Sequence, residues 1–204
     1  MKKPLFNHEQ KYNFSDYAEI NIPLEEIVAA FGYGYTVEKI KFSQEHSVAT
    51  AIIQRLNSYY DNIFLKVNLT NELAKREFLI APILIELAQY LAIKIYVEYP
   101  LYVNDQLSGY LDYLLTTQNQ LVVIEPKKKD LDGGFNQLAA ELIALDQAQE
   151  STAKPLYGAI TLGDLWKFAI LNRNSKILIK DIFSYTIPHD TAELVTILLN
   201  ILAN

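Results

Sequence analysis

Two carboxylates and a lysine near the middle of the chain have the residue types and spacing of a metal site. Asp112 lies in SGYLDYLL, and Glu125-Pro126-Lys127 directly follows the apolar run LVVI. Two adjacent antiparallel strands would bring Asp112 and Glu125 together, because cross-strand neighbours stand about 5 Å apart. Carboxylate oxygens are ligands that Mg²⁺ or Mn²⁺ accepts. We therefore expect Asp112 and Glu125 to hold a metal ion and Lys127 to assist an attacking water.

The position of this motif in the chain is more informative than its residue types, because charged residues are common at strand ends. Glu125 follows a fully apolar run, which predicts a central strand buried on both faces. The carboxyl edge of such a strand is where α/β proteins place their sites. Side chains also alternate along a strand, so Glu125 and Lys127 share one face.

Composition predicts an ordinary globular domain. The chain has 204 residues, 50% of them hydrophobic, which suffices for one domain with a sizeable core. No apolar run reaches the roughly 18 residues of a membrane-spanning helix, so we expect no membrane partner and a cytoplasmic location. The chain lacks cysteine, which excludes disulfide frameworks, thiolate metal sites and cysteine nucleophiles. Motifs for nucleotide hydrolysis, hydride transfer, serine hydrolysis and zinc proteolysis are also absent.

The net charge of −6 argues against a protein that simply coats DNA, because non-specific affinity comes from neutralising phosphates with Lys and Arg. It does not exclude a nuclease, since a carboxylate-rich metal site is itself negative. A local cluster such as Lys127, Lys128 and Lys129 could still face phosphate.

Apolar periodicity predicts an α/β fold. We expect a helix over 44–59, a helix over 71–91 that Pro82 bends or divides, and a meander of three strands. A helix then follows Gly133-Gly134 and ends near Glu150. The predicted strands are 93–103, 107–117, 120–126, 156–162, 165–171 and 177–183, with a closing helix over 191–203. Helices before and after a mixed sheet indicate an α/β sandwich.

We expect a single domain with three parts. Residues 1–69 form an N-terminal arm and helix, of which 1–43 is irregular apart from a short helix after Pro23. Residues 70–171 form the core, and residues 172–204 form a C-terminal extension that ends in a helix.

The core resembles the PD-(D/E)XK nucleases, the restriction-endonuclease-like superfamily, over roughly residues 70–171. NELAKREFLIAPIL is similar to the family's glutamate–arginine helix motif, which places Glu72 in the acidic position with Arg76 beside it. Asp112 matches the motif aspartate, Glu125-Pro126-Lys127 matches (D/E)-x-K, and Gln137 lies in the following helix, where a glutamine is common. YGAITLGDLWKFAIL resembles the paired strands of type I restriction-subunit relatives, and FSDYAEINIPLEEIVAAFGY resembles the opening of small cyanobacterial proteins.

The resemblance implies an αβββαβ core, with a mixed central sheet flanked by helices, and a Mg²⁺- or Mn²⁺-dependent endonuclease acting on DNA. Asp112, Glu125 and Glu72 would be the metal ligands, and Lys127 and Gln137 would complete the catalytic residues. Glu77 competes with Glu72 for the helical acidic position. Proline between Glu125 and Lys127 departs from the usual family pattern.

Two other functions remain open at this stage. The fold could serve as a non-catalytic interaction or nucleic-acid-associated module, or work with a protein partner that supplies DNA contacts. A homodimer could form through the apolar helix TAELVTILLNIL, provided that an apolar face of residues 194–202 is exposed. His8, His46 and His189 are too scattered to form a site, and Trp166 is expected in the core.

Overall fold

The computed structural model describes residues 10–117, 121–126, 131–148 and 154–203. Strands in these ranges form one mixed sheet of eight strands, in the order β1-β7-β6-β5-β4-β3-β2, with β8 paired to β6. The strands are β1 (Gly34–Glu38), β2 (Lys94–Asn104), β3 (Leu107–Thr116), β4 (Leu121–Pro126), β5 (Leu156–Thr161), β6 (Leu165–Asn172), β7 (Ile177–Asp181) and β8 (Tyr185–Thr186).

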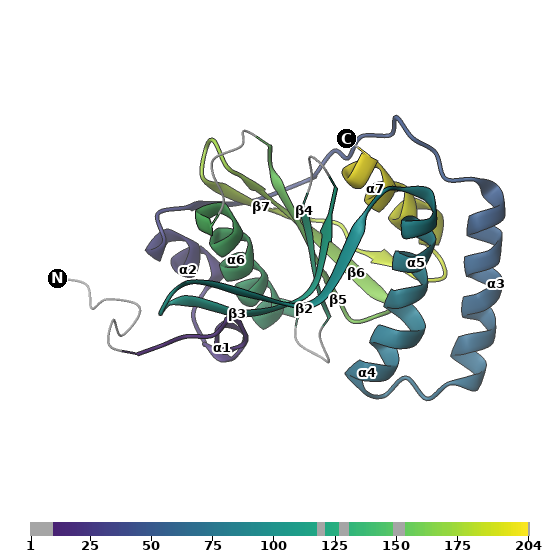
Figure 1. The fold of residues 1–204 in the computed structure, drawn as a ribbon, viewed down its shortest axis with the longest axis horizontal. Coiled ribbons are helices and arrows are strands. Elements are labelled where there is room, and N and C mark those ends of the chain that lie inside the picture. The colour runs from purple at the N-terminus through teal and green to yellow at the C-terminus, as the bar shows by residue number, and fades with distance from the viewer. Residues whose placement is uncertain (1–9, 118–120, 127–130, 149–153, 204) are drawn as a thin grey trace.

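Helices cover the sheet in two layers (Figure 1). Layer A contains α3 (Thr50–Lys66), α4 (Glu72–Lys75), α5 (Ala81–Tyr90) and α7 (Thr191–Ala203). Layer B contains α1 (Phe14–Glu19), α2 (Leu24–Ala30) and α6 (Leu131–Ala148). Each layer buries its own apolar cluster against the sheet. The expected α/β architecture, a mixed sheet flanked by helices, is therefore confirmed. None of the described helices is long and apolar enough to cross a membrane.

The predicted meander is present as β2, β3 and β4, which pair antiparallel in chain order. Strand β4 then pairs parallel with β5. Parallel neighbours need a crossover connection, and α6 provides it. Gly133 and Gly134 lie inside this helix, whereas we had expected them before its start.

The predicted helix over 71–91 is divided, as Pro82 suggested. Asn71 caps α4, since its side-chain oxygen accepts a hydrogen bond of 2.7 Å from the backbone N–H of Ala74. A π-helical segment, η1 (Arg76–Ile80), then joins α4 to α5. Pro82 lies in the first turn of α5, where the missing N–H costs little. The division places Arg76 at the first position of the π-helical segment.

The short helix expected after Pro23 is present as α2, but the expectation that the rest of the N-terminal arm is irregular is wrong for the described residues, which also form α1 and β1. Helices α1 and α2 bury Phe14, Tyr17 and Ile27 in the layer B cluster. Strand β1 pairs parallel with β7, so the N-terminal region and the C-terminal extension are neighbours in one sheet. Burial of these apolar side chains against α6 explains why the segment is ordered.

The apolar face that a dimer through the C-terminal helix would need is not exposed. The apolar residues of α7 pack into the layer A cluster, where α7 closes the core. Those with buried side chains are Leu194, Val195, Ile197, Leu198, Leu199, Ile201 and Leu202. The structure therefore removes the basis for a homodimer built through residues 194–202.

The long hairpin of β2 and β3 bends where it leaves the sheet and extends past α6 (Figure 1). Ile95 packs on the layer A cluster, whereas Tyr99 and Leu101, also odd-numbered, pack on the layer B cluster. The odd-numbered side chains of β2 therefore face layer A at residue 95 and layer B at residues 99 and 101. Glu98 lies at this change with a φ of 53°, a left-handed conformation that is uncommon outside glycine. The bend is the local feature that positions the candidate site.

Candidate functional site

The two predicted carboxylates lie on neighbouring antiparallel strands of the sheet. Tyr113 on β3 pairs with Ile124 on β4, and both side chains belong to the layer A cluster. The pairing of β3 with β4 ends at these two residues, and Asp112 and Glu125 are the next residues along the two strands. Glu125 in turn pairs with Ile160 on β5. Strand β4 therefore has neighbours on both edges, as the apolar run LVVI predicted for a central strand.

Glu125 is buried, with 2% of its surface exposed, and it contacts the inner face of α6. The side-chain nitrogen of Gln137 donates a hydrogen bond of 2.6 Å to Oε1 of Glu125. The same nitrogen donates one of 2.9 Å to Oε1 of Glu141. Gln137 and Glu141 are one turn apart and so lie on the same face of the helix. One amide thus links two buried carboxylates, which need such donors because burying a charge is costly.

Asp112 lies at the bend of the hairpin, and its side chain is 22% exposed. Its Oδ1 is 3.5 Å from Nη1 of Arg76, which reaches it from the π-helical segment of layer A. The guanidinium carbon of Arg76 lies 5.2 Å from the centre of the Tyr113 ring, in a cation–π arrangement. Arg76 is therefore held between the aromatic ring and the carboxylate.

Glu98 is a residue of this site that the sequence analysis missed. Its Oε1 is 3.9 Å from Nη1 of Arg76, so one guanidinium faces the carboxylates of both Glu98 and Asp112. The sequence signal is a single acidic residue within the aromatic and β-branched segment 93–103. Glu141 was missed as well, although it is an acidic residue on the apolar face of the predicted helix after Gly133-Gly134.

The predicted residues are brought together only in part. Gln137 is buried and contacts Glu125. Glu72 is half-buried in the first turn of α4. Among the residues described, no group of three or more His, Cys, Asp or Glu side chains is placed to hold a metal ion, so Glu72 does not form such a group with Asp112 and Glu125. Lys127, with Lys128 and Lys129, lies outside the described residues.

The remaining candidates have ordinary surroundings. Glu77, His46 and His189 are exposed. Trp166 is fully buried, and its ring nitrogen donates a hydrogen bond of 3.1 Å to the backbone oxygen of Gly163. The core placement expected for Trp166 is thus confirmed.

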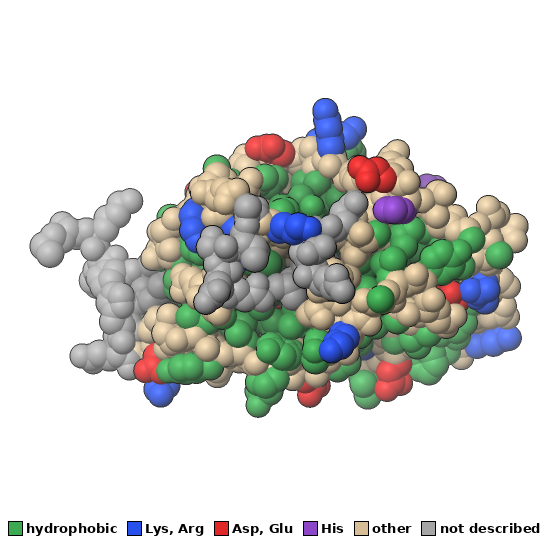
Figure 2. Space-filling model, turned by 45° about the horizontal axis from the view of Figure 1, so that its top comes forward, with side chains coloured by type: hydrophobic (Ala, Val, Ile, Leu, Met, Phe, Trp, Pro, Cys, Tyr) green, Lys and Arg blue, Asp and Glu red, His purple; other side chains and the backbone are tan. Residues whose placement is uncertain are grey.

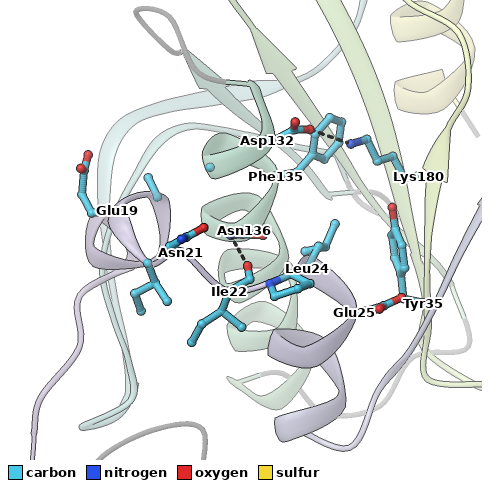
Figure 3. A pocket seen from close by; sticks show the side chains of 14 residues that line it. Glu19, Asn21, Ile22, Leu24, Glu25, Tyr35, Asp132, Phe135, Asn136 and Lys180 are labelled. Carbon is cyan, nitrogen blue, oxygen red and sulfur yellow. Dashed lines mark hydrogen bonds and ion pairs between the residues drawn. The ribbon is translucent and has the colours of Figure 1, made fainter.

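A separate pocket of about 590 Å³ lies beside the first turns of α6 (Figure 3). The loop between α1 and α2 forms one wall, and Tyr35 and Lys180 form another. Lys180 lies 3.3 Å from Asp132 and over the ring of Phe135. None of the predicted site residues lines this pocket. It is distinct from the region of Asp112 and Glu125.

Comparison with known proteins does not assign the chain to a family. No family model matches its sequence, and no curated protein is significantly similar to it. A function for this chain must therefore be argued from the geometry of the site.

Proposed function

We propose that this protein is a Mg²⁺-dependent nuclease that hydrolyses phosphodiester bonds in DNA. The observation that carries the proposal is the position of Asp112 and Glu125 on neighbouring strands, each one residue beyond the pair Tyr113↔Ile124, while Gln137 holds the Glu125 carboxylate. The order of elements supports it, since a divided helix is followed by three antiparallel strands, a crossover helix and a parallel strand. This is the order expected of a restriction-endonuclease-like core.

The donor set fits a hard divalent cation. Asp112 and Glu125 offer carboxylate oxygens, and Mg²⁺ commonly takes one or two carboxylates and completes its shell with water and substrate phosphate. A third protein carboxylate is therefore not required, and Glu72 need not reach the ion. When bound, Mg²⁺ supplies positive charge that offsets the negative charge developing on the phosphate.

The residues of the chain have separate roles in this proposal. Gln137 fixes the orientation of the Glu125 carboxylate, because its amide donates to Oε1 and is itself held by Glu141. Asp112 is more exposed than Glu125 and would meet the ion and substrate from the solvent side. Lys127 would orient the attacking water or stabilise negative charge on phosphorus.

A non-catalytic module on the same fold is the second candidate. Arg76 favours it, because the positive charge 3.5 Å from Asp112 already balances one of the two proposed ligands. Among the described residues on the face shown in Figure 2, charged side chains of both signs are scattered, and Lys and Arg do not gather into a broad basic patch. Such a module would meet DNA through a partner protein that supplies the phosphate contacts.

Cleavage of plasmid DNA by the purified chain separates the two candidates. The nuclease should nick or degrade the plasmid with Mg²⁺ or Mn²⁺ but not with a chelator, and Asp112→Asn and Glu125→Gln should abolish the cleavage. Asp61→Asn is a matched control, since Asp61 is an exposed acid on α3. Cleavage that persists in both site variants or in the chelator would refute the nuclease. A protein that binds DNA without cleaving it would support the non-catalytic module.

A further inference from the structure

Arg76 differs from two other arginines of the chain in how it meets its carboxylates. Arg55 donates to Glu86 at 2.8 and 2.7 Å, and Arg173 donates to Asp146 at 2.7 Å. Arg76 instead lies 3.5 Å from Asp112 and 3.9 Å from Glu98. Charge-assisted hydrogen bonds are about 2.7–2.9 Å long. The guanidinium of Arg76 is thus attracted to two carboxylates but lies too far from each for a short charge-assisted hydrogen bond.

The position of this guanidinium is nevertheless well defined. The Arg76 side chain is only 16% exposed, and its guanidinium lies over the Tyr113 ring. Arg76 is the first residue of the π-helical segment, whose Leu79 and Ile80 are buried in the core. A guanidinium is always charged and presents parallel N–H donors that match two oxygens of one phosphate. Arg76 is therefore an oriented cation, held by the Tyr113 side chain and loosely by two carboxylates, and its fork can exchange these loose contacts for an oxyanion.

The backbone at Glu98 is strained, and this strain lies beside Arg76. Glu98 has a φ of 53° within β2, where an extended conformation is normal. Val97 pairs with Tyr113, and Tyr99 pairs with Leu111. Glu98 and Asp112 lie between these two pairs and are not paired with each other. Strained residues persist where the surrounding structure holds them, and they are concentrated at functional sites. The Glu98 carboxylate faces the same guanidinium as Asp112.

We infer that Arg76 binds a phosphate of the substrate polynucleotide. In the free protein Glu98 and Asp112 hold the guanidinium at the bend of the hairpin. When substrate binds, the guanidinium exchanges its loose contact with Asp112 for two non-bridging oxygens of a phosphodiester. The inference rests on the proposed function, which places the substrate beside Asp112. It assigns Arg76 to the recognition of phosphate and not to a structural ion pair.

Binding of a short fluorescent DNA duplex, measured in a chelator so that no cleavage occurs, tests this role. Arg76→Gln should weaken binding roughly 10- to 100-fold, the range expected when a charged hydrogen-bonding partner is lost. The slope of log affinity against log salt should also fall by about one. Arg76→Lys keeps the positive charge but lacks the parallel N–H donors of a guanidinium. It should therefore retain most of the salt dependence of binding and lose part of the affinity for DNA. Arg55→Gln, which breaks an exposed ion pair on α3, should leave both quantities unchanged.

A double-mutant cycle separates phosphate binding from a structural role. Asp112→Asn should strengthen DNA binding in the chelator, because it removes a negative charge and releases Arg76 from its competing partner. The gain should be much smaller in the Arg76→Gln background, since the two side chains interact directly. If Arg76 only stabilises the fold, Arg76→Gln should lower the melting temperature and the two changes should act additively on DNA binding.

The outcomes also distinguish this inference from the proposed nuclease. If Arg76→Gln binds DNA with the affinity and salt slope of the wild type, Arg76 is not a phosphate ligand, even where cleavage depends on Asp112 and Glu125. If DNA binding depends on Arg76 but no metal-dependent cleavage occurs, the phosphate contact stands and the nuclease does not. Failure of the wild type to bind the duplex at low salt would overturn the inference. If Arg76→Gln does not fold, the affinity and slope of Arg76→Lys decide.

Discussion

Gln137 on α6 donates a hydrogen bond of 2.6 Å to Glu125 on β4. This contact joins the central strand of the proposed site to the helix that covers it. Because the same nitrogen also holds Glu141, the orientation of the Glu125 carboxylate depends on a second buried acid on the helix. The site is therefore supported from layer B, while Arg76 reaches it from layer A.

Replacing Gln137 should destabilise the protein. Gln137→Leu removes the donor shared by Glu125 and Glu141, and a buried polar group that loses its partner costs about 1–3 kcal/mol. Urea unfolding should show a loss of this size. Gln147→Leu is the control, because Gln147 is exposed on the same helix and its replacement should change the free energy of unfolding little. Equal effects of the two changes would mean that the amide bridge does not stabilise the fold.

Divalent metal should raise the melting temperature of the wild type through binding to the folded state. Asp112→Asn and Glu125→Gln should each reduce this increment, because each removes a proposed ligand. Lys127→Met should keep the increment while cleavage is lost, since Lys127 is proposed to act on water or phosphate. Thermal shift and calorimetric titration with Mn²⁺ measure these effects. An undiminished increment in Asp112→Asn would exclude Asp112 as a ligand.

Asp146 should make the stability depend on pH in the acid range. Burial alone would raise the pKa of Asp146, but hydrogen bonds from Lys176, Tyr33 and Arg173 outweigh it and lower the pKa. The folded state therefore binds fewer protons at this carboxyl than the unfolded state does. This contribution is present above the ordinary pKa of an aspartate and is lost as the pH falls through the lowered value.

Asp146→Asn should accordingly lower the free energy of unfolding at neutral pH by about 3–5 kcal/mol, the cost of breaking a buried ion pair. Its stability should also change less than that of the wild type as the pH falls below about 4. Urea unfolding at several pH values measures both effects. The control Asp61→Asn should follow the wild-type pH dependence. A parallel loss of stability in the wild type and Asp146→Asn would contradict the role of the ion pair.

Gly158 on β5 should not tolerate a side chain, because α6 packs directly against it. A Cβ at this position would lie 2.9 Å from a methyl carbon of Leu138 and 3.0 Å from one of Leu142. Overpacking of this kind costs about 1–3 kcal/mol, so Gly158→Ala should lower the free energy of unfolding by that amount. Gly34→Ala is the matched control, since its Cβ would meet Ile177 at an ordinary 3.4 Å. Urea unfolding of both variants tests the close approach of helix and strand.

Local patterns in the sequence predicted most of the elements correctly. The closing helix over 191–203 and the strands of the meander were placed within a few residues, because apolar periodicity records which face of an element is buried. Pro82 marked the join in the helix over 71–91 for an equally local reason. The antiparallel pairing of β3 and β4, the strands that carry Asp112 and Glu125, also followed from sequence, since strands joined by short turns usually pair.

The tertiary structure decided everything that depends on distant segments. Strand β1 has five residues and pairs with β7 across most of the length of the chain, so no local pattern predicts that pairing. The same holds for Arg76, which meets Asp112 only because a π-helical segment and a bend at Glu98 face each other. Sequence alone thus determined which residues could do chemistry and which faces are buried. Which charges meet was determined by packing, because contacts between elements depend on the relative placement of whole layers.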